Sequence, residues 1–132
     1  MVIDRYHQYV LGAGTTRLLT TAIVSASLTA CHGEPRTATR DAAARGAVLI
    51  TQQACGSCHV IPGIEEADGK VGPPLSGFAR QRMIAGAIPN TPANLILFLR
   101  SPDAVVKGSV MPGQHLSDAQ LRDVAAYLGT LQ

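Results

Sequence analysis

The sequence predicts an all-α domain, because apolar residues beyond the first 30 positions recur at helical spacing and no stretch alternates as strands do. The first periodic stretch, over residues 41–54, is rich in alanine, and the last extends from Ser117 to about Leu128. Between them, residues 60–77 contain seven glycines and prolines, too many for regular structure. We therefore expect a few helices joined by long loops.

The helix predicted over residues 41–54 places Leu49 and Ile50 beside an alanine-rich face. Thr39 or Asp41 is a suitable N-cap for it. The preceding residues 32–40 are polar and contain glycine and proline, so they are predicted to form a linker.

Two further helices have start signals of their own. Thr91 followed by Pro92 is typical of an N-cap and first helical position, and Pro102 is expected to end that helix. At the C-terminal helix, Ser117 and Gln120 match a capping box, and the leucines on either side of that cap, 116 and 121, match a hydrophobic staple.

The motif Cys55-Gly56-Ser57-Cys58-His59 carries the chemistry of the chain. Two cysteines two residues apart, followed directly by histidine, form the attachment signal of a c-type haem. One turn of backbone places each sulfur where it can add to one haem vinyl group, and the histidine then lies beneath the iron as a proximal ligand. A covalently bound haem would also supply the large apolar body that a small domain without tryptophan needs.

Two other interpretations of the cysteine pair are less favoured. A structural zinc site needs four ligands, and the remaining candidates, Cys31, His32 and His115, do not form a second paired cluster. A thioredoxin-like thiol pair needs a βαβ context, which the sequence does not predict.

Three side chains are candidates for the sixth ligand of the iron: Met83, Met111 and His115. We favour Met111, because it lies in a glycine-flanked loop that can direct a thioether at the metal. Met83 is expected to fill the core, and His115 to be solvated. A filled sixth position favours electron transfer. An open one would favour the alternative function, a haem enzyme or a protein that binds nitric oxide, carbon monoxide or peroxide.

Residues 1–30 are predicted to be a lipoprotein-type export signal. Two arginines precede an apolar run from Leu18 to Leu28, too short to span a bilayer, which closes on Leu28-Thr29-Ala30-Cys31. This ending resembles a bacterial lipobox, in which Cys31 is lipidated and becomes the new N-terminus. The protein is then exported and lipid-anchored on the periplasmic side of a bacterial membrane. A secretory signal cut near Ala30, or an uncleaved anchor, remains the alternative.

Charge argues against nucleic acid as a partner. The chain has 11 Lys and Arg against 9 Asp and Glu, with no basic stripe and no interleaved aromatic residues. The neighbours of the cysteine motif, Val60, Ile61 and Pro62, are apolar, and the only lysines are Lys70 and Lys107. We therefore expect an apolar docking face.

Five motifs follow one another along the chain: Cys55-Gly56-Ser57-Cys58-His59, Gly72-Pro73-Pro74-Leu75, Met111-Pro112, Leu116-Ser117-Asp118 and Val124-Ala125-Ala126-Tyr127-Leu128. In this order they resemble the class I monohaem cytochromes c of bacteria, of the lipoprotein type, over residues 41–132. From Pro89 onward the sequence is also similar to c-type domains found with, or fused to, haem-copper oxidases.

The resemblance implies a small fold of three to four helices and loops around one covalently bound haem c. It implies that Gly46 lets the terminal helix cross closely at Tyr127. It also implies that the carbonyl of Pro73 accepts a hydrogen bond from His59, fixing that ligand. The haem propionates are expected to meet Arg80 or Arg82, since the tryptophan that many relatives use is missing.

The function implied is one-electron transfer by a carrier that is not itself an enzyme. The implied partner is a membrane redox complex, such as a haem-copper oxidase or a quinol:cytochrome c oxidoreductase. The carrier would serve it as a mobile shuttle or as a fixed subunit. Three regions are thus expected: the export signal at 1–30, a lipidated N-terminus and linker at 31–40, and a cytochrome c domain at 41–132.

Overall fold

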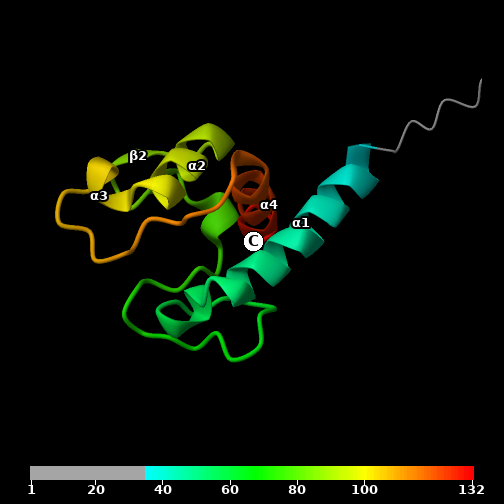
Figure 1. Cartoon of the computed structure of the whole chain (residues 1–132), viewed down its shortest axis with the longest axis horizontal. Coiled ribbons are helices and arrows are strands. Elements are labelled where there is room, and N and C mark those ends of the chain that lie inside the picture. The colour runs from blue at the N-terminus through cyan, green and yellow to red at the C-terminus, as the bar shows by residue number, and fades with distance from the viewer. Residues whose placement is uncertain (1–34) are drawn as a thin grey trace, which may run out of the picture. The chain divides into compact units, whose positions relative to one another are not determined.

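The computed structural model describes residues 35–132, so the predictions for the export signal and for Cys31 lie outside the described residues. The described chain is mostly helical, as predicted (Figure 1). Its elements are α1 Pro35–Gln52, η1 Cys55–Ser57, η2 Phe78–Arg80, β1 Met83–Ile84, β2 Ile88–Pro89, α2 Pro92–Arg100, α3 Pro102–Val105 and α4 Asp118–Leu128, where η marks a short 3-10 helix.

The first helix starts earlier than predicted. α1 begins at Pro35, so residues 35–40 are helical and are not a flexible linker, and Thr39 and Asp41 lie inside the helix and do not cap it. The sequence reasoning took Pro35 as a helix breaker. Proline is tolerated in the first turn, where its missing N–H has no helical partner to lose. The helix thus continues to within a few residues of Cys31.

The capping predictions for α2 and α4 are confirmed. The backbone N–H of Asn94 donates to the hydroxyl of Thr91, 3.2 Å away, and Pro92 opens α2. At α4, Ser117 and Gln120 form the reciprocal capping box. Pro102 ends α2 as expected, but it also opens the four-residue helix α3, which the sequence did not predict.

The described chain also contains a small hairpin that the sequence analysis missed. Strands β1 and β2 are antiparallel, with Ile84 opposite Ile88 and Met83 opposite Pro89. Each strand has two residues, too few to show an alternating pattern. The turn places Ala85 and Gly86 at positive φ, 49° and 70°, and an alanine is an unusual residue at such a position.

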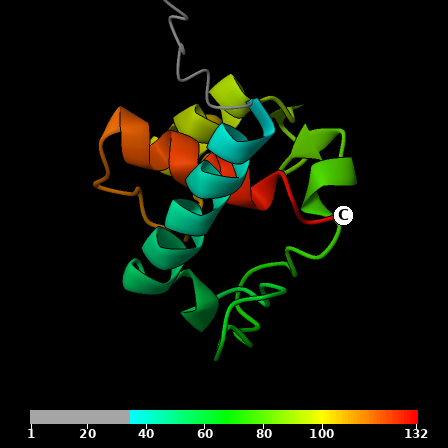
Figure 2. The same ribbon diagram turned by 90° about the vertical axis from the view of Figure 1, so that its right-hand side faces the viewer.

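Helices α1 and α4 cross in close contact (Figure 2). A methyl group built on Gly46 would lie 2.1 Å from the carbonyl oxygen of Asp123 and 3.0 Å from Cβ of Tyr127. The expectation that Gly46 permits this crossing is therefore confirmed. Only a residue without a side chain lets the two backbones approach this far.

An ion pair closes the edge of the same crossing. Nε and one terminal nitrogen of Arg45 each donate to a different carboxylate oxygen of Asp123, both at 2.8 Å. The hydrogen bond from Arg45 lowers the pKa of Asp123 below its usual range, with the positive charge adding to the effect. Because the folded pKa lies below the unfolded one, the pair stabilises the fold above the unfolded pKa and loses that effect as the pH falls.

The core lies between α1, α2 and α4 and is mainly aliphatic. Ile50 and Leu121 are its most completely enclosed side chains, and Phe78 is the aromatic residue in it. Its further members are Leu49, Ile61, Ala67, Ile84, Leu95, Leu99, Val124, Leu128 and Leu131. No described helix is long and apolar enough to cross a membrane.

We predict that Gly46→Ala destabilises the fold by about 1–3 kcal/mol, because the added methyl group forces α1 and α4 apart. Gly129→Ala is a matched control: Gly129 has φ −65°, and its added methyl group would lie 3.3 Å from the nearest carbonyl oxygen. Thermal unfolding of both holoproteins followed by circular dichroism measures the difference. A Gly46→Ala protein as stable as the Gly129→Ala protein would contradict the tight crossing.

Candidate haem site

The five residues of the cysteine motif form a tight turn directly after α1. The N–H groups of Cys58 and His59 both donate to the carbonyl of Cys55, at 3.2 and 3.1 Å. Ser57 donates from its hydroxyl to the carbonyl of Ala54, at 2.8 Å, which fixes the start of the turn. Cys55 and Cys58 are free, partly buried thiols. One short turn therefore carries two thiols and the histidine.

The surroundings of Cys55 are apolar enough to change its acidity. Burial raises the pKa of the Cys55 thiol, because the thiolate would lose hydration. A backbone hydrogen bond opposes this effect, and the nearby Cys58 adds to it. The sulfur thus lies in an environment that favours an uncharged form, such as a thiol or a thioether.

His59 is oriented by a backbone carbonyl. Its Nδ1 lies 2.8 Å from the carbonyl oxygen of Pro73, and because a carbonyl only accepts, Nδ1 carries the proton. This is the contact that the family resemblance implied. In the neutral imidazole this leaves Nε2 as the nitrogen with the free lone pair, and Nε2 has no hydrogen-bond partner among the described residues. An imidazole held in this way is prepared to bind a metal through Nε2.

The loop of residues 60–77 is held against this turn along its length. Gly69 N–H donates to the carbonyl of Gly56 at 3.0 Å, and Gly72 N–H donates to the carbonyl of Cys58 at 2.8 Å. A methyl group built on Gly72 would lie 2.3 Å from Cε1 of His59 and 2.6 Å from its Nδ1. The glycine therefore lets the loop lie directly on the imidazole.

A contact from the terminal helix secures the same loop. The hydroxyl of Tyr127 donates to the carbonyl of Pro62 at 2.7 Å, although the two residues are 65 positions apart. Burial raises the pKa of this phenol, which keeps it a donor at neutral pH. Sequence reasoning gave Tyr127 a role in the helix crossing and missed the hydrogen bond. It also quoted Gly72 within a motif without finding its contact with His59.

The predicted sixth ligand, Met111, lies in the loop between α3 and α4. Its side chain is half-buried and packs against the core. The loop is held at both ends: Gly108 N–H donates to Asp103 at 2.7 Å, and Gln114 N–H donates to the carbonyl of Leu99 at 2.8 Å. Met111 is thus carried by a loop of defined shape.

The two other candidates for the sixth ligand lie outside the core. His115 is exposed, as expected. Met83 was expected to fill the core, and this is wrong: it is 40% exposed. The reason is its place in β1, where it pairs with Pro89 on the outer face of the hairpin while Ile84 faces the core.

The predicted docking residue Ile61 is a second correction. It is only 2% exposed and belongs to the core, because its N–H bonds to the carbonyl of Ala67 and turns the side chain inward. Of its neighbours, Val60 is partly buried and Pro62 is exposed. Two exposed apolar side chains, Val71 and Val110, lie in the loops beside the site, 72% and 87% exposed. An apolar docking face stays a prediction, and these two valines, rather than Ile61, are its candidate members.

Arg80 and Arg82 are both exposed, and neither forms an ion pair with a described carboxylate. The guanidinium of Arg80 lies back over Gly77, within 3.1 Å of the position that a Cβ there would take. Their contact with the haem propionates stays a prediction.

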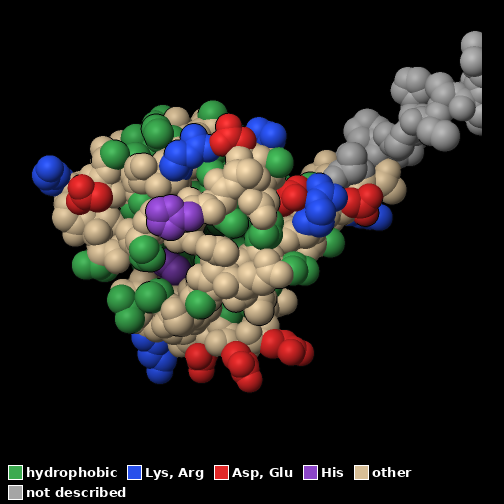
Figure 3. All heavy atoms as spheres, viewed as in Figure 1, with side chains coloured by type: hydrophobic (Ala, Val, Ile, Leu, Met, Phe, Trp, Pro, Cys, Tyr) green, Lys and Arg blue, Asp and Glu red, His purple; other side chains and the backbone are tan. Residues whose placement is uncertain are grey.

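The residues present fit a haem. Partly buried apolar side chains pack against the core and stay in part accessible, among them Cys55, Leu75, Ile96, Phe98, Met111 and Leu116. Figure 3 shows a narrow hollow in the face it draws, with one histidine side chain outside it and another set back inside. Of the two described histidines, His115 is exposed and His59 is partly buried. Two thiols, one oriented imidazole and partly accessible apolar side chains are what a covalent haem requires.

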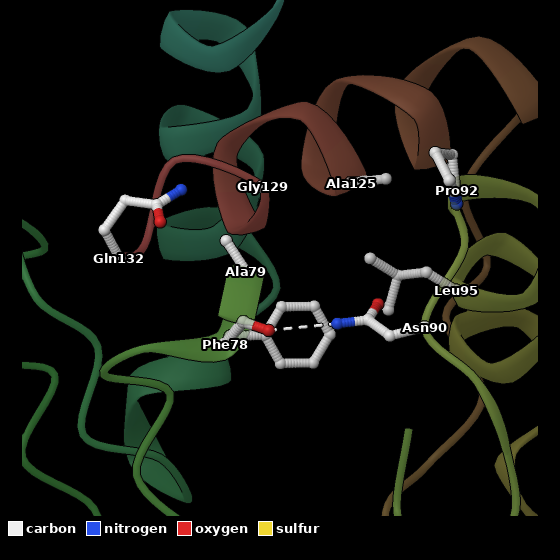
Figure 4. Close-up of a pocket in the computed structure, with 8 residues that line it drawn as sticks. All are labelled: Phe78, Ala79, Asn90, Pro92, Leu95, Ala125, Gly129 and Gln132. Atoms are coloured by element: carbon white, nitrogen blue, oxygen red, sulfur yellow. Dashed lines mark hydrogen bonds between the residues drawn. The ribbon is translucent and has the colours of Figure 1, made fainter. Parts of the chain in front are cut away.

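Other sites are not supported in the described part of the chain. No three His, Cys, Asp or Glu side chains converge there as a zinc site would need. A separate hollow of about 220 Å³ lies between Phe78, Asn90, Leu95 and the end of α4 (Figure 4). Its lining carries no charged side chain, and the Asn90 amide is already used by the carbonyls of Phe78 and Gln81.

Comparison with known proteins agrees with this site. The model of the Cytochrome c family matches residues 43–132, so the chain belongs to the cytochrome c family, whose covalently bound cofactor is haem c and whose role is electron transfer. It is also similar to cytochrome c oxidase subunit 2 of Alkalihalophilus pseudofirmus, with 30% identity over 95 residues. The match covers 71% of this chain and 27% of that relative, so the chain spans about a quarter of the relative's length. No solved structure matches the chain.

We predict that Gly72→Ala disturbs the proximal side of the haem without detaching it. The added methyl group must displace the imidazole of His59 and lengthen its bond to Pro73, while both cysteines are untouched. The visible spectrum and reduction potential of the purified protein should therefore change, with haem retained in acid acetone. Ser76→Ala, an exposed change in the same loop, is the control. An unaltered spectrum in Gly72→Ala would contradict this prediction, because it would show that the loop of residues 60–77 moves and His59 keeps its position.

Proposed function

We propose that this chain is a one-electron carrier in which His59 and Met111 would hold the haem iron. The single observation that carries this proposal is the fixed imidazole of His59, with Nδ1 bonded to Pro73 and Nε2 free. When bound, haem c supplies an iron that cycles between Fe(III) and Fe(II). Cys55 and Cys58 attach it, and a Met/His ligand pair raises its potential.

The same residues argue for a carrier and against an enzyme. Met111 is half-buried on a loop fixed at both ends, so its thioether is suited to stay in one position. If His59 and Met111 both bound the iron, a substrate would have no place on it. The alternative function, the binding of a small ligand, would need one of these positions to be left open.

We predict that Met111→Ala lowers the reduction potential and lets azide or carbon monoxide bind where the parent resists them. Loss of the sulfur removes the ligand that favours reduced iron. Met83→Ala is the matched control, since Met83 lies on the outer face of the hairpin. Spectroelectrochemistry and ligand titration of both holoproteins measure the two effects. If Met83→Ala produces them and Met111→Ala does not, the assignment is wrong.

The carrier is proposed to work at a membrane, tethered by a lipid on Cys31. The lipobox-like ending Leu28-Thr29-Ala30-Cys31 supports the tether. Because α1 begins at Pro35, three residues separate Cys31 from the helix, and the four Cα-to-Cα steps between Cys31 and Pro35 span about 14 Å when fully extended. The domain would then stay at the membrane surface on the periplasmic side.

We predict that Cys31→Ser releases the protein into the soluble periplasmic fraction, or leaves the leader uncleaved, while haem attachment persists. Fractionation of cells and mass spectrometry of the N-terminus distinguish these outcomes. A correctly cleaved variant that stays with the membrane would contradict a lipid on Cys31 and would point to a protein anchor.

The proposed partner is a membrane redox complex. A haem-copper oxidase is favoured because the relative is named as an oxidase subunit, and a quinol:cytochrome c oxidoreductase would be the electron donor. Beyond residue 30 the chain carries nine Lys and Arg against eight Asp and Glu, so little charge is available to steer the encounter. Val71 and Val110 instead offer an apolar surface on the two loops beside the site.

We predict that Val110→Asp slows oxidation of the reduced protein by its own membranes several-fold, and more than Lys107→Ala does. Val48→Asp is the matched control, because Val48 is 56% exposed on α1, outside both loops. Stopped-flow measurements at low and physiological salt give the rates. A rate that falls about tenfold or more over this salt range, or a dominant effect of Lys107, would show that charge controls docking.

A further inference from the structure

The hairpin formed by β1 and β2 presents an apolar outer face. Residues 83–89, Met-Ile-Ala-Gly-Ala-Ile-Pro, contain no polar side chain. Ile84 and Ile88 face the core, whereas Met83 and Pro89, which lie opposite each other, are exposed together with the turn residues Ala85, Gly86 and Ala87. A projecting turn is usually polar, so this composition needs an explanation.

Backbone geometry makes the composition more unusual. Ala87 N–H donates to the carbonyl of Ile84 at 2.9 Å, and the two residues between them have positive φ. Ala85 is the first of these two residues, with φ 49°. Asn, Asp or Gly adopts a positive φ readily at this position of a turn, whereas alanine is strained there. An apolar residue is therefore present where a polar one would fold more easily, which is typical of a functional constraint.

Positive side chains flank the hairpin. Residues 69–102 contain four Lys and Arg and no Asp or Glu, but Lys70 belongs to the loop of residues 60–77 and Arg100 pairs with Asp118, which leaves Arg80 and Arg82 beside the hairpin. Arg82 is exposed directly before β1, without an ion-pair partner among the described residues. At the start of α1, Arg36 and Arg40 line a hollow of about 390 Å³. Within α1 the acidic side chain is that of Asp41, next to Arg40 in the sequence.

The hairpin and the start of α1 both lie in the upper part of the domain in Figure 1 and Figure 2. Figure 1 shows them on opposite sides of α2, and the turn after α1 and the loop of residues 60–77 occupy the lower part in both views. The start of α1 is also where the proposed lipid tether joins the domain, four residues from Cys31. The apolar turn and the arginines, which have no ion-pair partner among the described residues, are thus in the same part of the domain as the proposed tether.

We propose that this part of the domain, the hairpin of residues 83–89 with Arg36, Arg40 and Arg82, docks on the surface of a bilayer that contains anionic phospholipid. The apolar turn enters the boundary between headgroups and acyl chains, and the arginines bind lipid phosphates. A second copy of the chain is a poorer occupant, because the exposed side chains are few and small compared with a stable dimer interface. The cysteine motif then points away from the membrane, toward the soluble part of a partner.

The proposal rests on the membrane location given above, and its test does not require the lipid. The holoprotein is made with Cys31→Ser behind a leader that is removed on export, and is sedimented with vesicles at millimolar lipid. We expect it to bind vesicles of phosphatidylethanolamine and phosphatidylglycerol, and to stay in the supernatant with phosphatidylcholine. Arg82→Gln should weaken binding about fivefold.

Two turn variants and one control separate insertion from charge alone. Ala85→Asp should weaken binding at least as much as Arg82→Gln, and Ala87→Trp should strengthen it, because tryptophan favours the interface. Ala54→Asp is matched to Ala85→Asp, since Ala54 is also an exposed alanine at positive φ, at the opposite end, and should bind almost as the parent does. The Soret band confirms that each variant retains haem.

Several results would overturn the proposal. Equal binding to both lipid mixtures, no binding to either, or equal effects of Ala54→Asp and Ala85→Asp would each contradict it. A dimer in sedimentation equilibrium that Ala85→Asp dissociates would identify a second copy as the occupant. A wrong prediction of the lipid on Cys31 would be detected in the fractionation of cells. It would not change the vesicle experiment, in which the protein carries no lipid.

Discussion

The close crossing of α1 and α4 is the constraint on which the rest of the structure depends. Gly46 lets the backbone of Asp123 approach to a distance that any side chain would prevent, and Arg45 closes the edge of the contact. The end of α1 then delivers the cysteine turn, and Tyr127 of α4 holds the loop at Pro62. Because that loop also carries Pro73, the orientation of His59 depends in turn on the crossing.

The core explains why the cofactor belongs to the fold as much as to the function. The buried side chains are mainly aliphatic, and several partly buried apolar side chains pack against them. A small domain gains limited stability from such a core. A flat apolar group attached through Cys55 and Cys58 would add to this core, so its attachment and the stability of the domain would be coupled.

The two ends of the domain differ in chemistry. One end carries the cysteine turn and a loop with Glu65, Glu66 and Asp68, and the other carries the apolar turn and arginines without ion-pair partners among the described residues. The proposed tether on Cys31 would restrict rotation as well as distance. A carrier oriented in this way would meet a partner through the loops of Val71 and Val110, with little need for electrostatic steering.

The sequence by itself determined the features that depend on neighbours within a few positions. The cysteine motif, the caps at Thr91 and Ser117, and the helical periods of α2 and α4 are of this kind, because one turn of helix decides them. The mostly helical fold and the family followed from their order along the chain. Gly46 and Pro73 were found only because the family resemblance assigned them contacts.

Only the tertiary structure decided which side chains are buried and which segments meet. Ile61 was expected to be exposed and is buried, because its backbone hydrogen bond to Ala67 turns the side chain inward. Met83 was expected to be buried and is exposed, because it lies on the outer face of a two-residue strand. The hydrogen bond from Tyr127 to Pro62 and the close contact of Gly72 with His59 each join residues that are far apart in the sequence. No local pattern in the sequence predicts such a contact. Such contacts depend on how helices pack, and packing is a property of the whole chain.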